Sequence, residues 1–389
     1  MSGKTEAIVL IHGSEAGQKD FNRDRLIAAL EQVPETGEVI RSEAQAVAGV
    51  EGVRLRVTRP GQPERTLDVY EAYWGDLVTR LTQEHLVNRV GRGLRVLFYW
   101  LHPKVWAGLG KYKWLSFNMA VMLLLMTFWL YGGLTLLFSQ AGSDPQFLGN
   151  LFGLMPGSTE APSMAASLWG KLVPTLKDWG AMMGSLKAWV IASLVMGVLP
   201  VSMVVDISDF TQRYLRNECA SPKELGLRYR IRNRVRRVLQ NVCESGQYER
   251  VTVVAHSFGV AIAVDILADY DSDKKVPLRF ISLAGPLELF SRRAEWIQTE
   301  IDRCAVNSHV KQWIDIYSSE DWFGFPIPIK KAPQGVVLQK PIQHGLGWLA
   351  RLTGETHWRY FDNEEVIHEL LASEPPQAQV VPLNAQQTG

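Results

Sequence analysis

Residues 251–267, with the sequence VTVVAHSFGVAIAVDIL, decide the fold prediction for this chain. A short apolar run that favours a strand leads into the five residues Ala255, His256, Ser257, Phe258 and Gly259, and an apolar stretch suited to a helix follows at once. The pattern predicts a strand, a sharp turn and a helix, with the serine at the apex of the turn. Ala255 and Gly259 are small, as residues must be where the strand and helix backbones pass close together.

Two interpretations of Ser257 are open. A turn of this kind lifts the hydroxyl group clear of the sheet at the start of a helix, where the helix dipole and the backbone N–H groups favour negative charge. The serine is then a candidate nucleophile. Alternatively, Ser257 is only the N-cap of the helix that follows. The flanking strand and helix favour the nucleophile.

The composition bounds the class of protein. The chain has 389 residues, enough for one large domain with an accessory element. Its 41 basic and 40 acidic residues nearly balance, so overall charge gives no reason to expect a nucleic-acid partner. The three cysteines, Cys219, Cys243 and Cys304, match no metal-ligand spacing and suit a reducing compartment. The N-terminal sequence MSGKTEAIVLIHGSE does not resemble a signal peptide.

Two long apolar segments interrupt this sequence. Residues 114–138 contain no charged residue and are long enough to cross a bilayer as a helix. Residues 181–205 form the second segment, with Lys187 near one end and Pro200 near the other. A buried core helix in a large soluble protein is the alternative for each. We expect both segments to be transmembrane helices that form a hairpin.

Flanking charge predicts how this hairpin is oriented. Residues 76–113 and 206–237 are rich in Arg and Lys, whereas the connection between the two segments holds only Lys171 and Lys177. Basic flanks stay in the cytoplasm, so the short connection is expected outside and the rest of the chain inside, at an inner or plasma membrane. The expected parts are a first piece of a cytoplasmic domain at 1–75, a basic juxtamembrane helical segment at 76–113, spans at 114–138 and 181–205, the connection at 139–180, the rest of the domain at 206–372 and a disordered tail at 373–389.

The soluble parts alternate strands with helices. Strands are expected at 6–11, 251–254, 278–283 and 311–318, a hairpin at 53–59 and 66–73, and helices at 20–32, 227–243, 260–267, 291–304 and 364–371. Alternation of this kind predicts an α/β domain, whose mostly parallel sheet is covered by helices on both faces.

With its serine elbow and with His-Gly directly after the strand IVLI, the chain resembles the α/β-hydrolase superfamily, in particular lipase- and esterase-like members. The resemblance covers residues 6–73 and 229–371 and leaves the apolar hairpin uncovered. It implies the chain order serine, acid, histidine, with the acid after a late strand and the histidine after the last one. It also implies an oxyanion hole from the N–H of Phe258 and an N–H of the loop at 12–17, with Ser14 or Gly13 as the donor.

The segment WIDIYSSEDWFG supplies the acid that the resemblance implies. Asp321 lies just beyond the expected strand, at the sheet edge where active-site groups of parallel sheets gather. Glu320 is the second choice, and Asp315 lies within the strand. An ordinary turn aspartate is the other interpretation of Asp321.

The segment GETHWRYFDNEEVIHEL supplies the base, His357, which is followed by an aromatic residue, a short acidic turn and the last helix, as in the family. His344, in KPIQHGLGW, competes for this role, whereas His368 lies on the closing helix and is expected to be structural.

These residues together predict a membrane-anchored serine hydrolase. Ser257, His357 and Asp321 would cleave an ester or thioester through an acyl-enzyme, with no metal or organic cofactor. A site beside the bilayer favours a lipid or acyl substrate. The basic flanks either bind anionic phospholipid or only set the topology. The alternative function is a non-catalytic, membrane-tethered interaction or regulatory module that keeps the same fold.

Overall fold

The computed structural model describes residues 5–13, 18–32, 38–47, 49–58, 64–78, 86–106, 113–143, 174–175, 178, 181, 201–219, 221–274, 276–321 and 324–372. The chain forms two compact units. The first combines Met1–Val78 with Asn217–Gly389, and the second is Thr79–Arg216. The C-terminal piece of the first unit was expected to begin at residue 206, but α8 (Val201–Leu215) belongs to the second unit, where it packs against two other helices.

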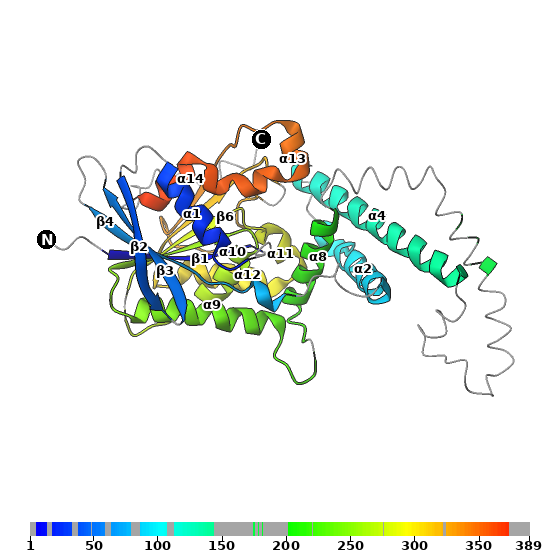
Figure 1. Ribbon diagram of the computed structural model, residues 1–389, viewed down its shortest axis with the longest axis horizontal. Helices are drawn as coiled ribbons and strands as arrows, with labels where there is room; N and C mark the ends of the chain where they lie inside the picture. Colours follow the sequence, from blue (N-terminus) through cyan, green and yellow to red (C-terminus); the bar gives the residue numbers. More distant parts are fainter. Residues whose placement is uncertain are drawn as a thin grey trace. The chain divides into compact units, whose positions relative to one another are not determined.

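The first unit is built on an eight-stranded sheet (Figure 1) with the order β2-β3-β4-β1-β5-β6-β7-β8. Its strands are β1 (Thr5–Ile11), β2 (Glu38–Val47), β3 (Val50–Thr58), β4 (Arg65–Glu71), β5 (Arg250–His256), β6 (Leu278–Leu283), β7 (Val310–Tyr317) and β8 (Val337–Pro341). Only the β2–β3 and β3–β4 pairs are antiparallel. The predicted α/β class with a mostly parallel sheet is confirmed.

Pairing of β1 with β5 joins the two pieces of the chain in this sheet. The two strands run parallel, from Glu6 opposite Arg250 to Ile11 opposite Ala255. Almost every residue of both strands is buried, as expected for central strands of a parallel sheet that is covered on both faces.

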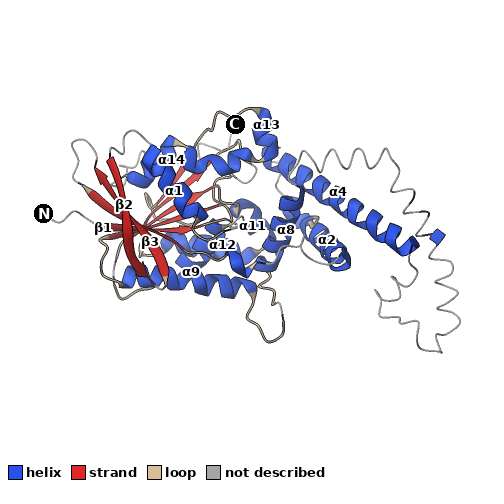
Figure 2. Ribbon diagram, in the orientation of Figure 1, coloured by secondary structure: helices blue, strands red, loops and turns tan. Residues whose placement is uncertain are grey.

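Helices cover both faces of the sheet. Figure 2 shows α1 (Phe21–Gln32) and α14 (Glu364–Leu371) on one face and α9 (Leu227–Glu244) on the other. The remaining helical elements of this unit are η2 (Gly75–Leu77), α10 (Gly259–Leu267), α11 (Leu287–Arg293), α12 (Glu295–Val306), α13 (Trp348–Thr353) and η5 (Glu355–Asp362). Apolar side chains of α1, η5 and α14 form a core with Ile8, Val254 and Ile314 of the strands.

Most expected elements of the first unit are present, and the differences have local causes. The single helix expected at 291–304 is instead α11 and α12, because the backbone of Ala294 is extended (φ −136°, ψ 107°) and interrupts the helix. Two strands were not anticipated. β2 is largely exposed, and β8 has only five residues, none of them buried, so neither shows the apolar alternation of a half-buried strand.

The second unit consists of helices in the part of the chain that the structure describes. Its elements are α2 (Leu86–Trp100), α3 (Pro103–Trp106), α4 (Lys113–Ser143) and α8, and α2, α4 and α8 pack against one another. The residues of the expected first span lie in α4. Within it, Met119–Leu136 is long and apolar enough to cross a membrane, and it is the one such stretch among the described helices.

Several expectations for the apolar hairpin fall outside the described residues. These include residues 182–200 of the expected second span, nearly all of the connection at 139–180, and the tail at 373–389. The described end of the second segment, Val201 to Val205, is the beginning of α8, which continues through Asp206 and Asp209. The two-span hairpin therefore stays a prediction.

Candidate active site

The residue at the apex of the elbow has an unusual backbone conformation. Ser257 lies between β5 and α10 with φ +56°, in the left-handed region that non-glycine residues seldom adopt. Its N–H donates to the carbonyl of Leu283 (2.8 Å), and its own carbonyl accepts from the N–H of Val260 (3.0 Å). Conformational strain of this kind costs about 1–3 kcal/mol and tends to occur at functional sites. The sheet and the helix therefore hold the serine in a strained turn.

Gly259 shows why the elbow needs small residues. A Cβ atom at this position would lie 2.2 Å from the carbonyl oxygen of Ile11 and 2.6 Å from that of His12. Both are backbone atoms, which cannot move aside cheaply. The start of α10 therefore passes directly over the end of β1. Ala255 is completely buried in β5, where its methyl group fits without displacing a neighbour.

Three side chains from distant parts of the chain meet at the elbow. Nε2 of His357 lies 2.7 Å from Oγ of Ser257. Nδ1 of the same ring lies 2.9 Å from each carboxylate oxygen of Asp321. All three residues are buried, with exposed fractions of 7% for Ser257, 5% for His357 and 0% for Asp321. The carboxylate can only accept, so the Nδ1–H tautomer is assigned and Nε2 is left to accept the serine proton.

The acid is held by its own loop and lies near a buried tyrosine. The N–H of Asp321 donates to the carbonyl of Ser318, one residue beyond β7 (3.1 Å). A Cβ at Gly324 would lie 2.7 Å from Cβ of Asp321 and 2.8 Å from the hydroxyl of Tyr360, so the returning chain passes close to both. Burial and the nearby charge of Asp321 raise the pKa of Tyr360 well above its usual value. Tyr360 therefore stays a neutral phenol beside the carboxylate.

The competing acids make other contacts. Glu320 accepts from the N–H of His344 (2.9 Å) and pairs with Arg351. Asp315 points into the sheet layer, where it accepts from the hydroxyl of Ser282 (2.8 Å) and from the N–H of Ile327 (3.0 Å). Burial raises the pKa of Asp315 to about 7. The geometry favours Asp321.

The competing histidines lie away from the serine–histidine pair. His344 packs edge-on against Tyr360, with ring centres 4.8 Å apart, and burial lowers its pKa. His368 is exposed on α14. The geometry favours His357.

The candidate oxyanion donors surround the serine. A Cβ on Gly13 would lie 2.9 Å from Cβ of Ser257 and 3.3 Å from its Oγ, so the backbone of Gly13 lies against the hydroxyl group. Phe258 stands at the N-terminal boundary of α10, where backbone N–H groups point out of the helix. Ser14 lies outside the described residues.

Sequence reasoning did not anticipate the role of His12. Its Nδ1–H donates to the carbonyl of Gly13 (2.7 Å), and its Nε2 accepts from the N–H of Trp74 (3.3 Å). The Trp74 ring stacks on the imidazole at 4.8 Å, and its indole N–H donates to the carbonyl of His12 (3.2 Å). Burial lowers the pKa of His12 to about 4, so the ring stays neutral. These contacts hold Gly13 in place against Ser257.

His256 was expected only as a member of the elbow, yet it also contacts the base. Its Nε2–H donates to the backbone carbonyl of His357 (2.9 Å), and the two rings lie 5.1 Å apart. Burial, with a smaller contribution from His357, lowers the pKa of His256 to about 3. A histidine beside a nucleophile was the available signal, but only tertiary structure reveals its partner.

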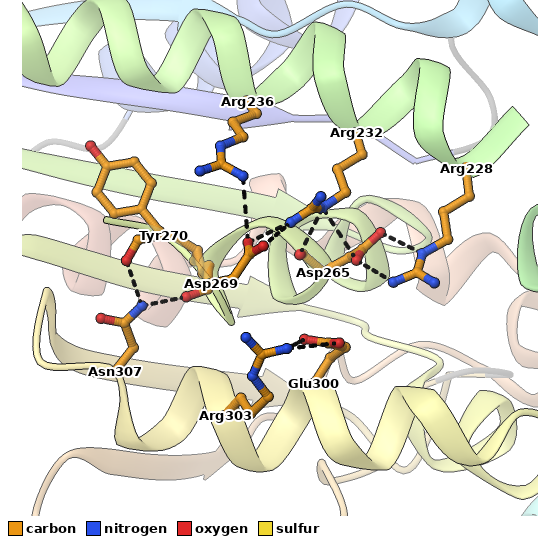
Figure 3. A network of polar contacts seen from close by, with 10 residues as sticks. Arg228, Arg232, Arg236, Asp265, Asp269, Tyr270, Glu300, Arg303 and Asn307 are labelled. Carbon is orange, nitrogen blue, oxygen red and sulfur yellow. Dashed lines mark hydrogen bonds and ion pairs between the residues drawn. The ribbon is translucent and has the colours of Figure 1, made fainter. Parts of the chain in front are cut away.

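Most arginines of the basic run in α9 pair with carboxylates of the first unit (Figure 3). Arg228 forms a bidentate pair with Asp265 of α10, and both Arg232 and Arg236 lie beside Asp269, two residues beyond the end of α10. Two further arginines face other carboxylates, Arg230 with Glu224 and Arg234 with Asp76. Paired guanidinium groups are poorly suited to recruiting anionic lipid. The contacts instead favour a role in joining α9 to α10.

Among the described residues, no three His, Cys, Asp or Glu side chains are grouped to hold a metal ion. A charged hollow of about 610 Å³ lies between α11, α12 and the segment around Lys330, and none of the site residues lines it.

Comparisons with known proteins found no similar family, curated protein or solved structure. Function must therefore be inferred from the geometry around Ser257.

Proposed function

We propose that this protein is a serine hydrolase with an α/β-hydrolase fold, which cleaves an ester or thioester through an acyl-enzyme. The proposal depends on the contacts of three buried side chains. One nitrogen of His357 contacts the hydroxyl of Ser257, and the other contacts the carboxylate of Asp321. A serine hydroxyl is a poor nucleophile near neutral pH and requires such a base and such an orienting carboxylate.

The reaction follows from this geometry. His357 accepts the proton of Ser257 through Nε2 while Oγ bonds to the substrate carbonyl carbon. Collapse of the tetrahedral intermediate breaks the bond to the leaving group, which takes the proton from His357. Water then repeats the sequence on the acyl-enzyme and releases the acid. Asp321 keeps the proton on Nδ1 and stabilises the imidazolium that forms in each half.

Stabilisation of the oxyanion is assigned to backbone donors. The N–H of Phe258 lies one residue beyond the nucleophile, and the backbone of Gly13 lies against Ser257. The N–H of Ser14 remains a candidate from the sequence. Backbone donors fixed before the reaction are effective because they need not reorganise as charge develops, and loss of one donor costs about 10²–10³-fold in rate. His12 supports this arrangement by bonding to Gly13.

The proposed substrate is a lipid or another long-chain acyl ester. It rests on the apolar stretch Met119–Leu136 of α4, which would keep the enzyme at a bilayer. The basic flanks of the apolar segments in the sequence favour a cytoplasmic location for the catalytic unit. The site itself selects no head group or chain length.

A fluorophosphonate probe tests the proposal, because it reacts only with an activated serine. We expect full-length protein in membranes to be labelled, and Ser257→Ala and His357→Ala to abolish labelling. Ser291→Ala, a change on α11, is the matched control and should label like the wild type. Hydrolysis of an acyl ester should fall by about 10⁴–10⁶-fold in the Ser257 variant. Folded wild-type protein that is never labelled would instead indicate the non-catalytic, membrane-tethered module.

A further inference from the structure

Several large apolar side chains of the helical unit are exposed, although such side chains are usually buried in a water-soluble protein. Leu94, Phe98 and Leu101 recur at helical spacing on one side of α2 and just beyond it, with exposed fractions of 36%, 69% and 45%. On α4, Leu124 and Leu136 are 53% and 54% exposed. Leu94, Phe98 and Leu101 share one side of α2, and a row of exposed large apolar side chains favours a contact with lipid or another protein.

Helix α2, which carries several arginines, lies beside the apolar stretch of α4. A Cβ on Gly93 of α2 would lie 2.5 Å from the ring of Trp129 and 2.9 Å from Leu130, both in the middle of α4. Gly133 of α4 is close to Val90 of α2, so the two helices run antiparallel and α2 lies alongside the stretch itself. The sequence predicted a juxtamembrane helical segment here, and these contacts place α2 beside the apolar part of α4.

An ion pair between α2 and α8 lies beside this contact of α2 with α4. Arg92, next to Gly93, pairs with Asp209 of α8, and the exposed fractions of their side chains are 19% and 6%. Leu130 lies six residues from the end of the Met119–Leu136 stretch, or about 9 Å along the helix axis. If α4 crossed the bilayer, this ion pair would be shielded inside the helical unit, but exposed Arg95 would lie at the depth of the hydrocarbon, where an exposed charge is costly and rare.

We infer that α2 and α4 lie together in the plane of the membrane surface instead of α4 crossing the bilayer. The occupant of the apolar face is the acyl-chain region of a single leaflet. Arg95, beside the Leu94–Phe98–Leu101 stripe, is then positioned for anionic headgroups, as in amphipathic interfacial helices. This inference rests on the proposed membrane association, and it replaces two spans with one-sided insertion.

Sidedness of the end of α4 is the decisive measurement. Full-length protein is synthesised in the presence of membrane vesicles that contain an insertion translocon and have their cytoplasmic face outward, so that a spanning helix can insert, and is treated with a membrane-impermeant maleimide. Cys219, exposed in the first unit, reports the outer side, whereas Cys243 and Cys304 are buried. In a Cys219→Ser background, Ser143→Cys at the last residue of α4 should be labelled as fully as Cys219 in the parent. Labelling that appears only after detergent would show that α4 crosses the bilayer and overturn the inference.

A matched pair of substitutions tests the lipid contact of α2. Phe98→Glu should abolish flotation with the same vesicles. Phe21→Glu, at a phenylalanine of the first unit that is 59% exposed, should float like the wild type. Equal flotation of both variants would overturn the inference. Circular dichroism confirms that the variants are folded. Failure of the proposed hydrolase is a separate result, since it would remove fluorophosphonate labelling and leave flotation and sidedness unchanged.

Discussion

The two ends of the central sheet both bury polar side chains, but they do so differently. At the amino ends of β1, β4 and β5, Glu6 lies between Arg65 and Arg250, at 2.8 Å and 2.6 Å. At the carboxyl ends of β5 and β7, one carboxylate faces one imidazole, which in turn faces one hydroxyl group. Opposite charges are paired at the first end. At the second, the partner of Asp321 is the ring of His357, whose other nitrogen contacts the hydroxyl group of Ser257.

The pKa values differ in the same way. Burial lowers the pKa of Arg279, at the amino end of β6, only to about 10, and its guanidinium stays charged beside Glu369. At the carboxyl ends, burial lowers the pKa values of His12 and His256 far enough that both rings are neutral. Paired charge at one end serves stability, whereas neutral rings at the other end keep the backbone of Gly13 and His357 in place.

The largest expected effect is the loss of activity in Asp321→Asn. An amide at this position favours the wrong tautomer of His357, so kcat should fall by about 10⁴-fold while the thermal midpoint changes little. Glu320→Gln, at the neighbouring carboxylate, keeps an acceptor for His344 and should leave kcat nearly unchanged. Steady-state hydrolysis of an acyl ester measures both variants. Equal losses in the two would refute the assignment of the acid.

The second prediction concerns the ion pairs of Glu6 at the amino ends of the strands. Glu6→Gln leaves buried Arg65 and partly buried Arg250 without their carboxylate and should lower the free energy of unfolding by about 3 kcal/mol. Activity per folded molecule should be unchanged. Glu355→Gln removes an exposed pair with Arg359 and should cost about 1 kcal/mol or less. Urea unfolding with a parallel activity assay separates the two. A loss of kcat in Glu6→Gln would show that the two ends are coupled.

The third effect is a pH dependence that Asp315 introduces. Because burial raises its pKa from the usual 3.8 to about 7, the native state holds a proton that the unfolded chain has lost between these values. The contribution of Asp315 to stability is therefore full below pH 4, falls as the pH rises towards 7, and is constant above. Asp315→Asn should remove this loss, so the stability of the variant relative to the wild type should rise by about 2–4 kcal/mol over the interval. A flat difference in urea unfolding from pH 4 to 8 would contradict the prediction.

The smallest effect concerns His256. The substitution His256→Phe keeps an aromatic ring at this position but removes the N–H donor to the carbonyl of His357, so His357 is less well placed. We expect kcat to fall by about 10–100-fold with KM nearly unchanged. His256→Gln, which keeps an N–H donor, should recover part of the rate. A matching fall in thermal stability with no change in kcat per folded molecule would indicate a purely structural role.

Prediction from sequence succeeded for elements whose structure is determined by residues close together in the chain. The elbow could be located because β-favouring residues, a small-residue turn and a helix must be contiguous for Ser257 to project. The helices at α1, α9 and α14 could be located from periodicity and flanking polar residues. β2 and β8 could not, because exposed edge strands lack the apolar alternation that a buried face imposes.

For the site, the sequence proposed the members but not their contacts. Asp321 and His357 were selected through a resemblance that implies their order along the chain, and nothing local distinguishes Asp321 from Glu320. The two carboxylates diverge because one faces an imidazole and the other faces Arg351 and the N–H of His344. The roles of His12 and His256 depend on partners far away in the chain, so no sequence window contains them.

By itself, the sequence determined the α/β class, the strained serine turn and the presence of an apolar helix, because each depends on neighbours within a few residues. Tertiary structure decided which carboxylate and which imidazole meet the serine, that Arg228 and Arg232 of α9 pair with Asp265 of α10, and that α2 lies along α4. These outcomes depend on distances between segments that are remote in the chain, and burial among those segments sets the charge of each group.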